Sequence, residues 1–355
     1  MHTHSAATKN QLRLVFWETT TSCNLKCIHC RASAVPDRSP EELSYDQSCH
    51  LLSDIASFAR PVIVLSGGEP LVRPDIMDIA RFGHDLGLRM VLATNGTTVD
   101  AGVARDMVDA GIQRVSVSLD GADAITHDSF RGLPGAFDDA LRGIDYCKAA
   151  GMPVQINTTV AKHNLDQLPR ILELATTIGA CALHLFLLVP TGCGKEISGR
   201  EMISPVEYEG VLSWLYDASK TSTIKLKATC APHYFRVMRQ RAQEEGIRIT
   251  PETHGFEAMT KGCLAGSAVC FVSYRGEVYP CGYFPVSAGN VLSTPIQTIW
   301  NESDLFRTLR DVSLLKGKCG ACEFSRVCGG CRARAYGETG DYLGEEPYCV
   351  YQPRK

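Results

Sequence analysis

Three cysteines lie within eight residues near the start of the chain, in "TTTSCNLKCIHCRA". Cys23, Cys27 and Cys30, here called the cysteine triplet, have the spacing C-x3-C-x2-C. Thiolates suit iron–sulfur clusters, and three of them can hold three corners of a [4Fe-4S] cube. The fourth iron then has no protein ligand and stays open to a substrate or cofactor. Zinc is the alternative, but structural zinc normally takes four protein ligands, and only His29 is close enough in sequence to be the fourth.

Eight more cysteines lie in the last hundred residues, enough for two further metal centres. Four of them form the pattern C-x2-C-x5-C-x2-C in "CGACEFSRVCGGC", and an earlier pair brackets a predicted hairpin with Gly276 near its turn. Paired C-x2-C motifs also suit a zinc ribbon, which is the alternative interpretation. The candidate metal ligands are Cys263, Cys270, Cys281, Cys319, Cys322, Cys328, Cys331 and Cys349.

Composition favours a cytoplasmic location and metal-binding thiols. The 355 residues include 36 basic and 39 acidic ones, a net charge of -3, so there is no basic excess for nucleic acid. No run approaches the ~18 apolar residues of a membrane span, and "MHTHSAATKN" lacks the apolar core of a signal peptide. Cytosolic thiols stay reduced, so sixteen cysteines indicate metal ligands rather than disulfides. We expect the other five, Cys49, Cys147, Cys181, Cys193 and Cys230, to be small buried side chains.

The elements that must position these thiols alternate between strands and helices. Six β-rich runs cover residues 12–20, 61–68, 88–96, 114–121, 153–160 and 181–190. Amphipathic helical patterns separate them, at residues 46–59, 73–87, 100–111, 135–151 and 165–179. This rhythm predicts an α/β fold with a parallel sheet. Six units fall short of a closed eight-unit barrel, so we expect a partial, open (βα)6 barrel of the TIM type.

The C-terminal ends of these strands carry small and polar residues. The cysteine triplet follows the first strand, and "SGGEP", "TNG", "SLDG", "NTT" and "VPTGCGK" follow the next five. Each loop alone reads as ordinary turn chemistry. Barrel enzymes build their active sites at this edge, so six such loops together predict a shared site.

The triplet after the first strand, with "GGEP" after the second, resembles the radical S-adenosylmethionine (AdoMet) superfamily over about residues 11–220. The resemblance implies that AdoMet chelates the open iron and is cleaved to a 5′-deoxyadenosyl radical. It also implies AdoMet contacts from the loops that follow the strands, and a guanidinium suits the methionine carboxylate. The matching positions are Gly67, Gly68, Glu69, Pro70, Thr94, Asn95, Ser118 and Arg131.

The C-terminal cysteines resemble the SPASM (twitch-like) extension of such enzymes, which binds one or two auxiliary [4Fe-4S] clusters. The resemblance implies an outer cluster on Cys319, Cys322, Cys328 and Cys349. It implies an inner cluster on Cys263, Cys281 and Cys331, with Cys270 as a candidate fourth ligand. The chain departs from the family's pattern because two residues, not three, separate Cys328 from Cys331.

Three segments, "FWETTTSCNLKCIHCRA", "LFLLVPTGCGKE" and "KATCAPHYFRV", look most like the AdoMet-dependent heme synthases. That family oxidatively decarboxylates two propionates of Fe-coproporphyrin III to vinyl groups, giving heme b. The resemblance implies a tetrapyrrole substrate, anaerobic chemistry, and an electron donor such as flavodoxin or ferredoxin. Candidate groups for the substrate's carboxylates are Lys195, His233, Arg236 and Arg239, although His233 could instead ligate the heme iron.

Other functions remain as alternatives. Relatives of the same type include the didecarboxysiroheme deacetylase, a heme d1 enzyme and SPASM peptide maturases, and a cluster-bearing electron carrier is a further class. The expected organisation is an N-terminal tail at 1–10, the partial barrel at 11–220, a helical linker at 221–255 and the SPASM-like domain at 256–355.

Overall fold

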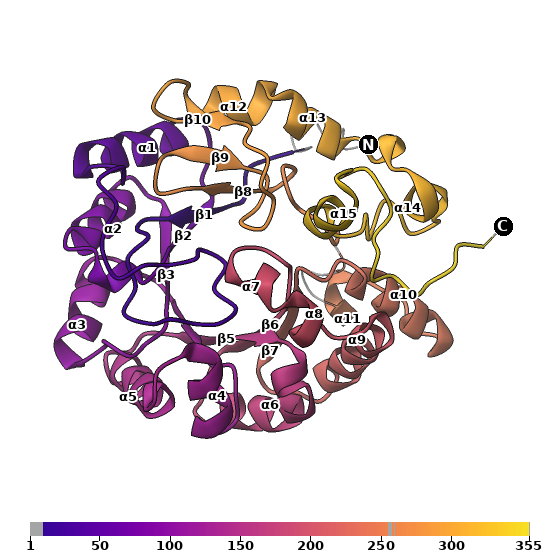
Figure 1. Ribbon diagram of the computed structural model, residues 1–355, viewed down its shortest axis with the longest axis horizontal. Helices are drawn as coiled ribbons and strands as arrows, with labels where there is room; N and C mark the ends of the chain where they lie inside the picture. Colours follow the sequence, from indigo (N-terminus) through magenta and orange to yellow (C-terminus); the bar gives the residue numbers. More distant parts are fainter. Residues whose placement is uncertain (1–9, 255–257, 259, 355) are drawn as a thin grey trace.

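One curved sheet of ten strands organises the molecule (Figure 1). A computed structural model describes residues 10–254, 258 and 260–354. The strand order across the sheet is β10-β9-β8-β1-β2-β3-β4-β5-β6-β7. The strands are β1 (Leu14–Glu18), β2 (Val62–Ser66), β3 (Arg89–Thr94), β4 (Val115–Ser118), β5 (Val154–Val160), β6 (Ala182–Leu187), β7 (Lys225–Thr229), β8 (Val269–Val272), β9 (Glu277–Tyr279) and β10 (Gly289–Asn290).

The six predicted strands and the five predicted helices are confirmed, and the strands β1 to β6 pair in parallel. Helices α1, α2, α3, α5 and α6 cover the outside of the curve (Figure 1). The helices are α1 (Tyr45–Phe58), α2 (Ile76–Asp85), α3 (Ala101–Asp109), α4 (Ala124–Arg131), α5 (Ala136–Ala149), α6 (Leu168–Thr177), α7 (Cys193–Glu196), α8 (Ser198–Glu201), α9 (Pro205–Ser219), α10 (Tyr234–Glu244), α11 (Pro251–His254), α12 (Ile296–Glu302), α13 (Asp304–Arg310), α14 (Gly317–Ala321) and α15 (Arg332–Thr339), with short 3-10 turns at Pro70–Val72, Lys162–Gln167 and Val312–Leu314.

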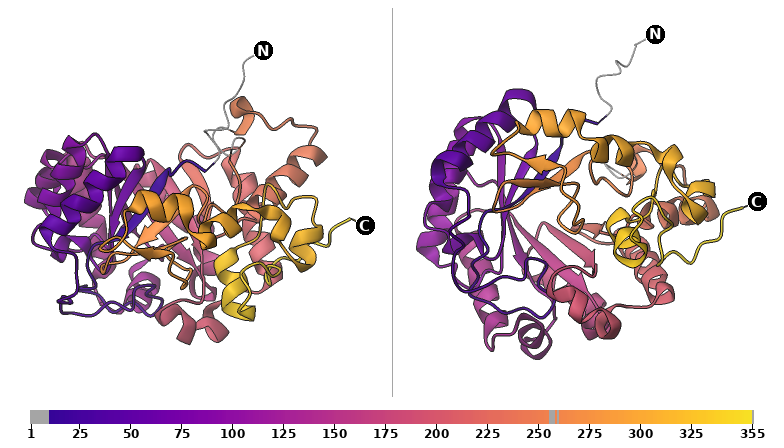
Figure 2. Two further views of the ribbon diagram at one scale, coloured as in Figure 1. Left: turned by 90° about the horizontal axis from the view of Figure 1, so that it is seen from above. Right: turned by 45° about the horizontal axis from the view of Figure 1, so that its top comes forward.

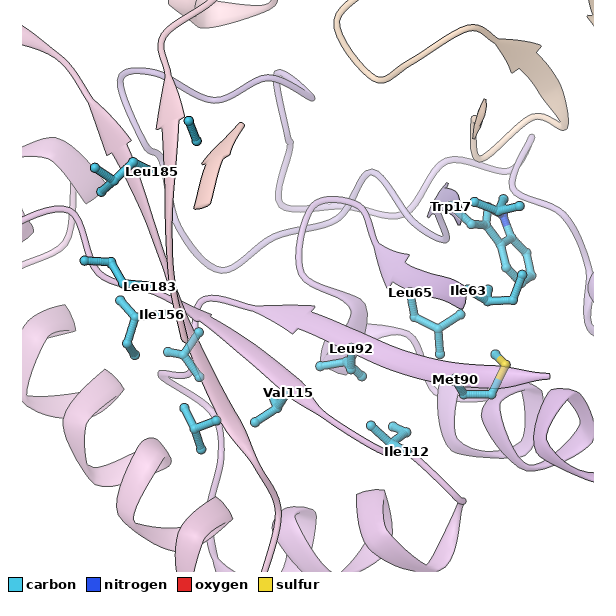
Figure 3. Close-up of a cluster of buried hydrophobic side chains, with 14 of the residues drawn as sticks. Trp17, Ile63, Leu65, Met90, Leu92, Ile112, Val115, Ile156, Leu183 and Leu185 are labelled. Carbon is cyan, nitrogen blue, oxygen red and sulfur yellow. The ribbon is translucent and has the colours of Figure 1, made fainter. Parts of the chain in front are cut away.

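Alternation along the strands separates a helix-facing core from an inner face. Trp17, Ile63, Met90 and Leu183 belong to one continuous buried cluster beneath the helices (Figure 3). Side chains at alternate strand positions point to opposite faces of a sheet. The intervening residues therefore face the inside of the curve, where polar side chains are frequent.

The expected helical linker at 221–255 is wrong in its first part. Strand β7 lies there and continues the barrel by pairing in parallel with β6, from Ala182↔Lys225 to Phe186↔Thr229. Strand β7 reads "KLKAT", which lacks the apolar run that identified the other strands. Helices α10 and α11 follow it, so the later part of that range contains helices as expected.

The C-terminal region is joined to the barrel rather than set apart from it. Strand β8 pairs in parallel with β1, from Leu14↔Val269 to Trp17↔Val272, and β9 returns antiparallel to β8 (Figure 2). This β8–β9 hairpin is the one predicted around Gly276. Of the predicted N-terminal tail only Asn10 is described, and residues 255–257 and 259, at the predicted domain boundary, are also outside the described residues. Within the described ranges, no helix is long and apolar enough to cross a membrane.

Candidate active site and metal centres

The cysteine triplet lies on the loop between β1 and α1, and a donor approaches each of its sulfurs. The donors and their distances to sulfur are Leu25 N to Cys23 (3.4 Å), Arg131 Nη1 to Cys27 (3.8 Å) and Ala34 N to Cys30 (3.4 Å). Hydrogen bonds to cluster sulfurs stabilise negative charge and tune reduction potential. The donor set therefore fits an anionic iron–sulfur cluster held by three thiolates.

The glycine pair of "GGEP" packs directly on the triplet loop. The amide of Gly68 donates to Thr20 O (2.8 Å) and that of Glu69 donates to Ser22 O (2.7 Å). A Cβ on Gly68 would lie 2.1 Å from Ser22 O, and Gly67 has a φ of +147°. Only glycines allow the two loops to approach this closely. The motif therefore positions the cysteines as well as lining the predicted AdoMet site.

Glu69 joins the loop after β2 to the loop after β3. Its carboxylate, fully buried, accepts hydrogen bonds from Thr94 Oγ1 (2.8 Å), Asn95 N (2.7 Å) and Leu71 N (3.1 Å). Burial raises the pKa of Glu69 to about 7, although these hydrogen bonds oppose the rise. Asn95 in turn reaches the triplet loop, because its Nδ2 donates to Asn24 Oδ1 (2.8 Å). Glu69 acts on the site by positioning these loops.

Arg131 and Asp120 form a buried ion pair beside Cys27. Arg131 Nη2 lies 2.6 Å from Asp120 Oδ2, and His29 Nε2 lies 3.2 Å from the same oxygen. Burial opposes ionisation of Asp120, but Arg131 and His29 outweigh it and lower the pKa of that carboxyl. His29 also stacks on Phe130 at 4.0 Å, so its ring belongs to this network and not to the sulfurs. Ser118, at the end of β4, lies on the inner face in register with Asn157.

Burial favours the protonated thiol over the thiolate at two of the three triplet cysteines, Cys23 and Cys27. Burial is the largest influence on Cys23 and raises its pKa to about 11, and burial also raises the pKa of Cys27 against the attraction of Arg131. Thiolates are the ligand form, so cluster loading at this loop releases protons.

The four predicted ligands of the outer cluster line one cavity. We call them the outer cysteines: Cys319, Cys322, Cys328 and Cys349. Donors reach three of the sulfurs, at 3.3 Å from Glu346 N to Cys319, 3.4 Å from Phe324 N to Cys322 and 3.4 Å from Gly330 N to Cys328. Gly329 and Gly330 both have positive φ, and a Cβ on Gly330 would lie 3.1 Å from the Cys319 sulfur. The shortened spacing between Cys328 and Cys331 is therefore accommodated by two glycines.

The three predicted inner ligands also lie together. Cys281 packs against the buried cluster that contains Cys331, and each of Cys281, Cys331 and Cys263 takes part in electrostatic interactions within the group. Among the described residues, no group of three or more Cys, His, Asp or Glu side chains is close enough together to hold a single metal ion.

The interpretation of Cys270 as a fourth inner ligand is wrong. Cys270 lies in the middle of β8, paired with Val15, and belongs to the helix-facing core. Its sulfur is fully buried, and burial alone raises its pKa, to about 12. The strand's alternation directs it away from the inner face.

Two of the predicted substrate ligands lie elsewhere. His233 and Arg236 line the cavity of the outer cysteines, and the Arg236 guanidinium already forms a fork with Glu209 (2.8 and 2.5 Å). His233 is fully buried near Glu346, and burial lowers its pKa to about 4. The prediction that His233 and Arg236 bind the substrate's carboxylates is therefore corrected: both residues line the cavity of the outer cysteines. Arg239 donates to Phe235 O (3.0 Å), and Lys195 is exposed on α7 after β6.

Sequence reasoning missed a polar row on the inner face. The register aligns Ser118 with Asn157, Asn157 with His184 and His184 with Lys227, across four strands. Burial, then the charges of Lys227 and Arg114, lower the pKa of His184 to about 3, so its ring is neutral. The signal was the alternation of polar residues in "VQINTTV" and "ALHLFL".

The sequence matches two family models. Residues 17–175 match the radical SAM superfamily, in which SAM is another abbreviation of AdoMet, and residues 263–331 match the iron-sulfur cluster-binding domain SPASM.

Curated relatives cover nearly the whole chain. The AdoMet-dependent heme synthase of Methanosarcina barkeri is 54% identical over 98% of this chain and 99% of its own length. The AdoMet-dependent heme synthase of Nitratidesulfovibrio vulgaris is 49% identical over 97% of this chain and 93% of its own. The Fe-coproporphyrin III synthase of Methanosarcina barkeri is less similar, at 31% identity over 96% and 88%.

Solved structures share the fold at low identity. The crystal structure of Streptococcus suis SuiB bound to S-adenosylmethionine aligns with a TM-score of 0.76 and 15% identity, covering 96% of this chain and 78% of that one.

Proposed function

This chain belongs to the radical SAM superfamily, within the family of the AdoMet-dependent heme synthases, and from this premise we propose that it converts two propionates of Fe-coproporphyrin III to vinyl groups, forming heme b. It is an enzyme whose radical SAM domain binds a [4Fe-4S] cluster and AdoMet, and whose SPASM domain binds auxiliary iron–sulfur clusters. The observation that carries the proposal is the 54% identity with a heme synthase over almost the full length of both chains.

Each conversion takes one hydrogen atom, one carbon dioxide and one electron from the substrate. When bound, the [4Fe-4S] cluster and AdoMet supply a 5′-deoxyadenosyl radical for the propionate β-hydrogen, and the auxiliary clusters supply an acceptor for the electron left behind. The bond to the carboxylate carbon breaks, and a carbon–carbon double bond forms. Cleavage of each AdoMet consumes one electron from a donor such as flavodoxin or ferredoxin.

The protein's task is to hold an unreactive propionate at the radical source, since positioning supplies much of such catalysis. The polar row on the inner face supports this role. Ser118, Asn157 and the neutral His184 ring lie in register on this row and carry groups that can hydrogen-bond to a carboxylate. Arg131 contacts the Cys27 sulfur and pairs with Asp120, which follows Ser118 by two residues in the sequence.

The deciding experiment supplies the anaerobic enzyme with Fe-coproporphyrin III, AdoMet and a strong reductant. We expect a monovinyl intermediate, then heme b, with two AdoMet consumed per heme. If the porphyrin binds and AdoMet is cleaved but every propionate survives in the mass spectrum, the proposal fails. Loss of acetate groups from didecarboxysiroheme would instead indicate the deacetylase reaction.

A further inference from the structure

Cys230, expected to be a small buried side chain, lies among the three inner cysteines. It follows strand β7 directly and, like Cys281, packs against the buried cluster that contains Cys331. The thiols of Cys331, Cys281 and Cys263 all act electrostatically on it. Pro232, two residues beyond Cys230, packs closely against Gly262, which precedes Cys263 in the chain. A Cβ on Gly262 would lie 2.6 Å from Pro232. Four sulfurs, from β7 and from the SPASM region, therefore gather at one place.

The backbone at Cys230 is held in an unusual conformation. Its φ is +58°, in the left-handed region that residues other than glycine rarely adopt. Its carbonyl accepts hydrogen bonds from Arg334 Nη2 (3.1 Å) and Tyr208 Oη (3.0 Å). Such conformations persist where the surrounding structure over-determines them, and they cluster at functional sites.

One buried ion pair ties Cys230 to Cys331. Arg334 Nη1 lies 3.2 Å from Glu346 Oε1, and Glu346 Oε2 accepts the amide of Cys331 at 2.6 Å. Both charged side chains are fully buried. A fully buried ion pair is costly unless it is well hydrogen-bonded. Here its hydrogen bonds connect the backbones of two cysteines from distant segments.

We propose that Cys230 is the fourth protein ligand of the inner auxiliary cluster, with Cys263, Cys281 and Cys331. Four thiolates satisfy a [4Fe-4S] cluster, so none of its irons stays open. The inner cluster would then bind no substrate and would serve electron transfer alone. The ligand comes from the end of the barrel's last strand, which couples the cluster to the barrel.

The test compares Cys230→Ala with Cys270→Ala, a matched removal of a buried thiol in the core. Both chains are reconstituted anaerobically, and iron content, Mössbauer spectra and electron paramagnetic resonance (EPR) of the reduced clusters are measured without substrate. With three cubanes the wild type should hold about twelve irons. We expect Cys230→Ala to lose between one and four of them and to change one auxiliary signal, while Cys270→Ala matches the wild type.

Full iron and unchanged spectra in Cys230→Ala would overturn the proposal, as would loss of the inner cluster in Cys270→Ala alone. If Cys230→Ala does not fold, Cys230→Ser decides. An oxygen ligand should retain iron but shift one auxiliary EPR signal, and an unshifted signal would reject the assignment. These readouts need no porphyrin, so they stand apart from the assay of the proposed function.

Discussion

Individual side chains around the triplet act mostly by holding loops in place. For Glu69 this role can be followed by pH, because its carboxyl group has a shifted pKa. An unfolded Glu titrates near 4.5, whereas burial raises the pKa of Glu69 to about 7 in the folded chain. Between these values the folded state keeps a proton that the unfolded state has lost. Stability from this group is therefore complete below pH 4.5 and is lost as pH rises through 7.

We therefore predict that the titration of Glu69 makes the free energy of unfolding fall by about 3 kcal/mol as the pH rises from 4.5 to 7.5. The Glu69→Gln variant should lack this pH-dependent fall. Chemical denaturation across that range measures it. Glu42→Gln is the control, because hydrogen bonds from Thr20 and Arg38 outweigh burial and lower the pKa of Glu42, so its effect belongs in acid. Parallel pH curves for wild type and Glu69→Gln would contradict the prediction.

At the scale of elements, the site depends on how closely the loops after β1 and β2 pack. Gly68→Ala would place a methyl group 2.1 Å from Ser22 O, where only backbone could move away. We expect a loss of about 1–3 kcal/mol of stability and at least roughly tenfold slower AdoMet cleavage, because the triplet loop shifts.

Thermal unfolding and 5′-deoxyadenosine release measure these two effects. The control is Gly210→Ala in helix α9, where an added Cβ meets nothing within 4 Å. It should keep full activity and gain up to about 1 kcal/mol, since alanine is the better helix former. Wild-type cleavage by Gly68→Ala would show that the loops can separate without cost.

At the scale of the whole molecule, one sheet joins the region of the cysteine triplet to the C-terminal region with its eight cysteines. Strand β8 pairs with β1, and Arg31 beside the triplet reaches both Glu18 (2.9 Å) and Gly282 O (3.4 Å). The SPASM thiols have their own supports, so removing the triplet should leave the auxiliary clusters in place. With Cys23, Cys27 and Cys30 all changed to Ala, we expect no AdoMet cleavage and about eight irons instead of about twelve.

Iron analysis and product assay of that variant check this prediction. The matched control replaces three cysteines outside both regions, Cys49, Cys147 and Cys181, which should change neither quantity. A triple variant that lost nearly all its iron would mean that the auxiliary clusters need the radical site in order to assemble.

The sequence by itself determined the features that depend on local spacing. The cysteine triplet, "GGEP", the six strands with their helices, and the pattern of the outer cysteines are all readable because ligand spacing and periodicity are properties of short segments. These also led to the radical SAM and SPASM families.

Only the tertiary structure decided which distant segments meet. It placed β7 at the sheet edge, turned Cys270 into the core, put His233 and Arg236 beside the outer cysteines and brought Cys230 to the inner group. The physical reason is register. A strand's alternation directs each side chain to one face, and that face follows from pairings between residues far apart in sequence, which no local pattern contains.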